Sequence, residues 1–167
     1  MVGEMRIELV GDLEIVTTRD FAAPRDLVFE AWTNPEHVRR WWGLRRQSLA
    51  LCQIDLRPGG KWRYVLREAD GKEVGFNGVY REIEAPAKVV ATYRYEPMPE
   101  FEAVTTTTFT ERNGVTTVRD VCRHNSKEER DGHYYSGMEQ GMRECFDRLT
   151  ELLESICNDQ LTAGGAK

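Results

Sequence analysis

Aromatic side chains are the residues of this sequence best suited to hold a ligand. Trp41 and Trp42 follow a short charged segment, "NPEHVRR". Neighbouring positions on a helix cannot both face inward, so we expect one ring in a core or cavity and the other at its mouth. Two interpretations remain open: the rings pack short helices onto a sheet, or at least one of them contacts a ligand.

The central segments repeat this aromatic pattern. In "KWRYVLRE" the side chains alternate, which places Trp62 and Tyr64 on one face of a strand. An aromatic wall with several hydroxyls suits a planar or partly polar ligand; the alternative is a filled core whose hydroxyls reach the surface. With two methionines one helical turn apart, the candidate cavity residues are Trp41, Trp42, Trp62, Tyr64, Phe76, Tyr80, Tyr93, Tyr95, Met138 and Met142.

The titratable residues predict no defined catalytic group. A strand arginine such as Arg94 would capture a carboxylate or phosphate if it faced a cavity, but exposed ladder pairs are the simpler interpretation. His124 and His133 flank the approach to the last helix, where a general-base role would need a partner. The sequence shows no such partner, and it does not show whether Asp120 and Glu82 meet.

No cofactor or metal site is expected from local motifs. The four cysteines are far apart with no C-x-x-C pair, and the three histidines form no H-x-x-x-H or H-E-x-x-H pattern. The turn "RPGGKW" lacks the G-K-[ST] ending of a phosphate-binding loop. The cysteines are most simply small buried apolar residues.

The elements that must position these residues follow from periodicity. Residues 13–21 are rich in β-branched side chains and predict a strand, and two short helices over 24–33 and 35–40 follow. Residues 48–122 predict about six antiparallel strands. An amphipathic helix is predicted from about Lys127 to Ile156. We expect a single domain over 13–156, an N-terminal extension or start of the first strand over 1–12, and a flexible tail over 157–167.

Composition narrows the classes of partner. A net charge of −5 with no long lysine/arginine run argues against nucleic acid. The Arg39–Arg40 and Arg45–Arg46 pairs form either a small anion-binding patch or a solvated rim. No stretch approaches the ~20 apolar residues of a membrane span, and no signal-peptide core is evident. A cytoplasmic location with reduced cysteines is expected.

Four segments in this order resemble the activator of heat-shock protein 90 ATPase homologue-like family of the SRPBCC/START-like superfamily, which includes the birch-pollen allergens. They are "FAAPRDLVFEAWTNPEHVRRWWG", "CQIDLRPGGKWRYVLREADGKE", "FNGVYREIEAPAKVVATYRYE" and "SGMEQGMRECFDRLTELLE". The resemblance implies an α+β helix-grip fold, in which a curved antiparallel sheet of about seven strands wraps around a long C-terminal helix with a hydrophobic cavity between them.

The resemblance does not imply one chemistry, because relatives of this fold bind lipids, hormones and polyketides, and some catalyse reactions on them. The leading hypothesis is a binding protein for a small hydrophobic or aromatic molecule, without catalysis. The alternatives are a cyclase-, dehydratase- or hydrolase-type enzyme of the same fold, and a stress-related co-chaperone of heat-shock protein 90. A monomer or weak homodimer is expected, without membrane insertion.

Overall fold

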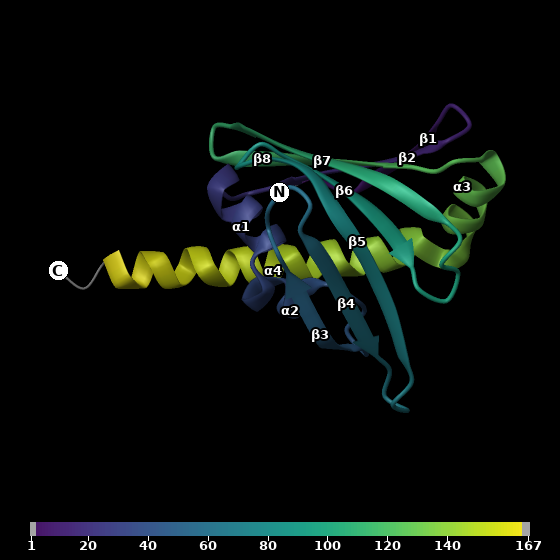
Figure 1. The fold of residues 1–167 in the computed structure, drawn as a ribbon. Coiled ribbons are helices and arrows are strands. Elements are labelled where there is room, and N and C mark those ends of the chain that lie inside the picture. The colour runs from purple at the N-terminus through teal and green to yellow at the C-terminus, as the bar shows by residue number, and fades with distance from the viewer. Residues whose placement is uncertain (1–2, 165–167) are drawn as a thin grey trace.

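The structure is a computed structural model that describes residues 3–164. It consists of one curved antiparallel sheet that wraps around a long helix (Figure 1). Within that range eight strands pair in the order β1-β2-β8-β7-β6-β5-β4-β3. Their bounds are β1 Arg6–Val10, β2 Glu14–Phe21, β3 Ser48–Ile54, β4 Lys61–Arg67, β5 Glu73–Glu84, β6 Lys88–Tyr95, β7 Glu102–Arg112 and β8 Val115–Arg123.

The helices lie at the ends and across the concave side of the sheet. They are α1 Arg25–Thr33, α2 Pro35–Trp41, α3 Lys127–His133, a π-helical segment η1 Tyr134–Met138, and α4 Glu139–Gly164. Figure 1 shows α4 crossing under the sheet, with α1 and α2 at one end, α3 at the other, and the last turns of α4 projecting beyond the sheet. No helix within residues 3–164 is long and apolar enough to cross a membrane.

Local sequence signals set where the shorter helices begin. Asn34 ends α1 and caps α2, because its side chain accepts a hydrogen bond from the Glu36 amide at 3.0 Å and Pro35 occupies the first helical position. Ser126 caps α3 in the same way, accepting from the Glu129 amide at 3.1 Å. The predicted second helix and its cap are thus confirmed.

Aromatic packing closes one end of the space between sheet and helix. Phe21 of β2 meets Phe146 of α4 edge to face, with ring centroids 5.8 Å apart. Phe109 of β7 makes similar contacts with Phe29 and Trp32 of α1, at 5.3 and 5.8 Å. Phe21 and Phe109 are fully buried. The dense core therefore sits where α1, α4 and the β2-β8-β7 part of the sheet converge.

The structure confirms the α+β helix-grip class and corrects two details. Eight strands replace the expected seven or so, because residues 6–10 form β1 and pair with β2 through a turn at Gly11. The last helix runs on to Gly164 instead of ending near Ile156, since residues 157–163 contain neither proline nor a terminating glycine. Residues 1–2 of the predicted extension and 165–167 of the predicted tail lie outside the described residues.

The π-helical segment between α3 and α4 is a second departure from the single predicted helix. Gly137 has φ 95°, which no residue of a regular right-handed helix adopts, so the helix kinks there. Glycine is favoured at this position because positive φ costs other residues a steric penalty. Residues on both sides of the kink, Met138 in η1 and Met142 in α4, line the space between helix and sheet.

Replacing Leu149 with alanine tests the grip of α4 on the sheet. Leu149 is fully buried, so the free energy of unfolding should fall by about 2–5 kcal/mol in chemical denaturation. Glu154→Ala, on the exposed face of the same helix, should change it by no more than about 0.5 kcal/mol. Equal effects of the two substitutions would show that this face of α4 does not carry the core.

Gly137 and Gly141 form a matched pair for testing the kink. A Cβ at either would have no neighbour within 4 Å, so steric contacts do not separate the two. Gly137→Ala should lower the free energy of unfolding by about 1–2 kcal/mol, because alanine is strained at positive φ. Gly141→Ala should raise it by up to about 1 kcal/mol, because alanine is the better helix former. A stabilising Gly137→Ala would contradict the kinked geometry.

Candidate functional site

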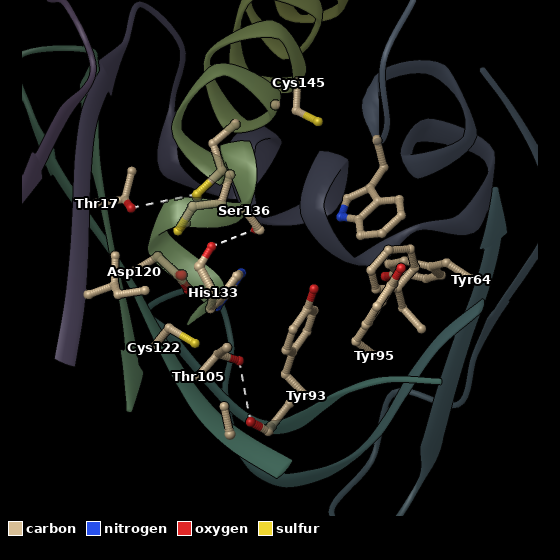
Figure 2. Close-up of a pocket in the computed structure, with 18 of the residues that line it drawn as sticks. Thr17, Tyr64, Tyr93, Tyr95, Thr105, Asp120, Cys122, His133, Ser136 and Cys145 are labelled. Atoms are coloured by element: carbon tan, nitrogen blue, oxygen red, sulfur yellow. Dashed lines mark hydrogen bonds between the residues drawn. The ribbon is translucent and has the colours of Figure 1, made fainter. Parts of the chain in front are cut away.

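A pocket of about 880 Å³ occupies the end of the grip that the aromatic core leaves unfilled. Its walls come from β4, β5 and β6 on one side, from β7 and β8 on another, and from η1, α4 and the α2 corner (Figure 2). All ten residues expected to face a cavity line this pocket. Their contact with a ligand stays a prediction.

The two adjacent tryptophans have different surroundings. Trp41 is buried, and its indole N–H donates to the Ala31 carbonyl at 2.8 Å, which fastens α2 to α1. Trp42 is half-buried and packs edge to face on Tyr64 and Phe76, with ring centroids 5.0 and 4.9 Å away. Trp41 is thus mainly a packing residue, whereas Trp42 presents its ring to the pocket beside the aromatic wall.

The aromatic wall is carried by three neighbouring strands. The Trp62 indole N–H donates to the Thr92 carbonyl at 3.1 Å and lies over Gly78, where a Cβ would collide with both groups. The Trp62 ring also packs on Tyr64, at 4.8 Å between centroids. Burial raises the pKa of Tyr64, so its phenol stays protonated at neutral pH. The wall therefore offers ring faces together with neutral hydroxyl donors.

The rim of this wall is more open. Tyr95 is 40% exposed and packs on Phe76, with centroids 5.4 Å apart. Met98 and Phe101, in the loop between β6 and β7, are exposed and also line the pocket. In Figure 2 the Tyr93 and Tyr95 side chains rise from the sheet toward the helical side of the pocket. An apolar molecule could enter past these side chains without disturbing the buried core.

Polar and sulfur groups collect at the opposite side of the pocket. Asp120, Cys122 and His124 occupy alternate positions along β8 and the residue after it, so all three face the pocket. The Thr107 hydroxyl donates to the Asp120 carboxyl at 2.7 Å. Burial nevertheless raises the pKa of Asp120 to about 6. This side of the pocket can therefore engage a polar end of a ligand.

His133, at the end of α3, joins this group from a different element. Its Nδ1 lies 3.0 Å from Nε2 of His124, and the Cys122 sulfur lies 3.6 Å from the same Nε2 atom. Burial, followed by the neighbouring His124 ring, lowers the pKa of His133 to about 4. Burial also lowers the pKa of His124. The three side chains are the potential metal ligands that the structure brings together among its described residues.

The methionines and glycines of η1 and α4 border the pocket from the helical side. Met142 accepts a hydrogen bond from the Thr17 hydroxyl, at 3.7 Å between oxygen and sulfur. Met138 packs against the buried cluster that contains Cys122. Unbranched methionine side chains adapt to irregular shapes, so this face can adjust to an occupant more readily than the strands can.

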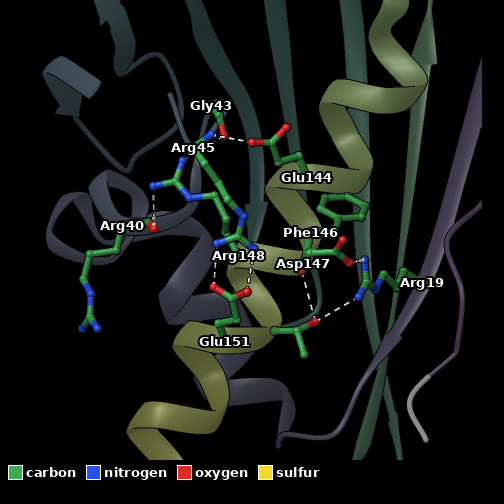
Figure 3. A network of polar contacts seen from close by, with 10 residues as sticks. Arg19, Arg40, Gly43, Arg45, Glu144, Phe146, Asp147, Arg148 and Glu151 are labelled. Atoms are coloured by element: carbon green, nitrogen blue, oxygen red, sulfur yellow. Dashed lines mark hydrogen bonds and ion pairs between the residues drawn. The ribbon is translucent and has the colours of Figure 1, made fainter. Parts of the chain in front are cut away.

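A polar network fixes the loop that follows Trp42 onto α4 (Figure 3). The Arg148 guanidinium donates to the carbonyls of Gly43 at 2.9 Å and Arg40 at 3.0 Å. Arg45 forms a two-pronged ion pair with Glu151, at 2.5 and 2.9 Å. Arg45 of the predicted basic patch therefore helps to fix the loop after Trp42 at the edge of the pocket. Arg94 likewise pairs with Glu102 at 2.7 Å, as expected for a strand ladder.

The family described as "Activator of Hsp90 ATPase homolog 1-like protein" matches residues 22–154. No functionally curated protein matches the chain. A Rhodobacter sphaeroides structure superposes with a TM-score of 0.84 at 23% identity, over 91% of this chain and 99% of that one. A Nitrosomonas europaea structure gives 0.80 at 23%, over 90% and 99%.

A Mycobacterium smegmatis structure is similar, with a TM-score of 0.79 at 22% identity over 92% of this chain and 97% of that one. At such identities these likenesses establish the fold alone. The family match is different in kind, because it extends over most of the sequence, from the residue after β2 into α4. The chain therefore belongs to the activator of Hsp90 ATPase homolog 1-like family, within the SRPBCC/START-like superfamily.

Proposed function

We propose that this protein binds a small hydrophobic or aromatic molecule in the pocket between the sheet and the kinked start of α4. The observation that carries the proposal is the uneven filling of the space between the sheet and α4. Aromatic residues close one end tightly, while the other end keeps a pocket of about 880 Å³. Ligand sites in proteins typically occupy about 300–1,000 Å³ and are lined mainly by apolar and aromatic groups.

The distribution of chemistry along the pocket specifies the class of molecule. The β4-β5-β6 wall presents ring faces and protonated phenols, which favour a planar aromatic body. Asp120 and the two histidines, on the β8 side, favour a hydrogen-bonding end. The proposed ligand is therefore flat and mostly apolar, with one polar end, such as a phenolic or polyketide-like compound.

The family's description also names a chaperone activator. A co-chaperone role would need a surface for a large protein, and an aromatic pocket inside the grip contributes nothing to such a surface. The pocket therefore supports small-molecule binding in preference to chaperone docking.

Thermal denaturation with a ligand panel tests the proposal. The panel would hold anilinonaphthalene sulfonate, aromatic carboxylic acids and polyketide-like phenols, after native mass spectrometry of the purified protein. A binder at one hundred times its Kd should add about 2.7 kcal/mol of stability. At about 2–4 °C per kcal/mol, the melting temperature should rise by roughly 5–10 °C. No bound mass and no shift with any compound would overturn the proposal.

Filling the pocket from the helical side locates the binding site. Met138→Trp should abolish the ligand-induced shift, because the indole would occupy space beside Cys122. Gln140→Trp, on the exposed face of the same helical region and outside the pocket, should preserve it. All four tryptophans line the pocket, so quenching of their fluorescence by anilinonaphthalene sulfonate gives a second readout. Equal loss in both variants would place binding elsewhere.

A further inference from the structure

We propose that Cys122, His124 and His133 form a binding site for Zn²⁺ in the wall of the pocket, with the ion's fourth coordination position open to the pocket. One thiolate and two imidazoles are a nitrogen–sulfur donor set that suits zinc. This inference goes beyond ligand binding and does not depend on it, because the three residues need no organic molecule to hold an ion.

The distances between the donor atoms are those of a tetrahedral site. With bonds of about 2.3 Å to sulfur and about 2.0–2.1 Å to nitrogen, ligands at a tetrahedral angle are about 3.6 Å (S to N) and about 3.3 Å (N to N) apart. The Cys122 sulfur is 3.6 Å from His124 Nε2, and that atom is 3.0 Å from His133 Nδ1. The donor atoms of all three residues lie within 4.8 Å of one another. Small side-chain rotations would complete the geometry.

Rigid elements hold the three ligands. Cys122 sits in β8 between β2 and β7, opposite Ile15 and Thr105. The backbone N–H of His124 donates to the Leu13 carbonyl at 2.9 Å. Sites built on paired strands and helix ends vary less in geometry than sites on free loops. The ion would therefore enter a site whose backbone is already in position.

The surroundings orient the His133 ring and shield the sulfur. The Tyr93 ring stacks on His133, with centroids 5.7 Å apart and planes 12° from parallel. Cys122 belongs to a buried apolar cluster with Ile15 and Ala103, against which Met138 packs. Such a shell limits access of water to the sulfur side of a metal site. Asp120 lies on the same face of β8, where its carboxyl can offset the charge that the ion adds.

The histidine pair also has an interpretation that needs no ion. Two neutral imidazoles at 3.0 Å can share one N–H···N hydrogen bond. The Cys122 sulfur, 3.6 Å from the same His124 Nε2, adds to the pair the third donor that a zinc site with one open position requires. Three protein ligands and one open position are the arrangement of zinc sites that bind a water or a substrate atom. An oxygen at the polar end of a pocket ligand is suited to that position.

Titration of the untagged, chelator-treated protein with Co²⁺ tests the proposal, because Co²⁺ replaces Zn²⁺ in tetrahedral sites and its absorption reports a bound thiolate. One equivalent should bind and give a sulfur-to-cobalt charge-transfer band, which Zn²⁺ then removes. Cys122→Ala should lose the band. Cys52→Ala should keep it, because Cys52 is an equally buried strand cysteine outside the trio.

His133→Gln supplies a second variant in case Cys122→Ala folds poorly. It should weaken Co²⁺ binding by at least about tenfold, since loss of an outer-shell partner alone typically costs 10–100-fold. Absence of the band in the parent protein, or an unchanged band in both Cys122→Ala and His133→Gln, would overturn the proposal. Because the probe is the metal alone, neither result depends on whether an organic ligand binds in the pocket.

Discussion

Edge-to-face packing of Phe21 against Phe146 is the contact on which the rest of the molecule depends. It joins β2 to the first third of α4, and Trp32 of α1 reinforces it by packing on Phe146 with centroids 5.8 Å apart. A curved sheet cannot follow a helix along its whole length, so tight packing at one place leaves separation elsewhere. The pocket is the space that remains once this contact is made.

Keeping that space open requires the helix and the α2 corner to stay in position. Arg148 does this from α4 by donating to carbonyls at the end of α2 and in the loop beyond it. The kink at Gly137 sets the direction of η1 at the far end. Charge-assisted hydrogen bonds are stronger than neutral ones, and here they hold backbone on both sides of Trp42. The pocket is therefore framed by fixed elements and bordered by adaptable methionines.

The two sides of the pocket differ in chemistry, and the two proposals follow that difference. The β4-β5-β6 wall offers aromatic faces, which account for an apolar ligand. On the β8 side, sulfur and imidazole donors from β8, the residue after it and α3 lie within 4.8 Å of one another. An ion there would give a flat ligand a single anchoring point. Binding of an organic molecule and binding of a metal can each be present without the other.

Periodicity in the sequence was enough to predict the strands and the two short helices, because each depends on local patterns of two or 3.6 residues. The helix-grip class was implied by the resemblance to the family. Alternation along the strands gave the six strand aromatics among the cavity candidates. Helical spacing gave Met138 and Met142, and the adjacent positions on a short helix gave Trp41 and Trp42. All ten candidates line the pocket. Strand β1 and the greater length of α4 were not predicted, because the sequence signals that mark where elements begin and end are weak. The π-helical kink was missed because glycines in a helical pattern signal reduced stability but not the place of a break.

The proposed zinc ligands, Cys122, His124 and His133, show most clearly what could not be predicted from the sequence. Asp120, Cys122 and His124 stand at alternate positions, a pattern that the sequence contains and that could have placed them on one face. His133 could not be added to them, because its position depends on how α3 folds back against the sheet. Sequence by itself thus determined the elements and the faces of each strand. Only the tertiary structure decided which faces meet and where space remains, because long-range packing between residues such as Phe21 and Phe146 sets those distances.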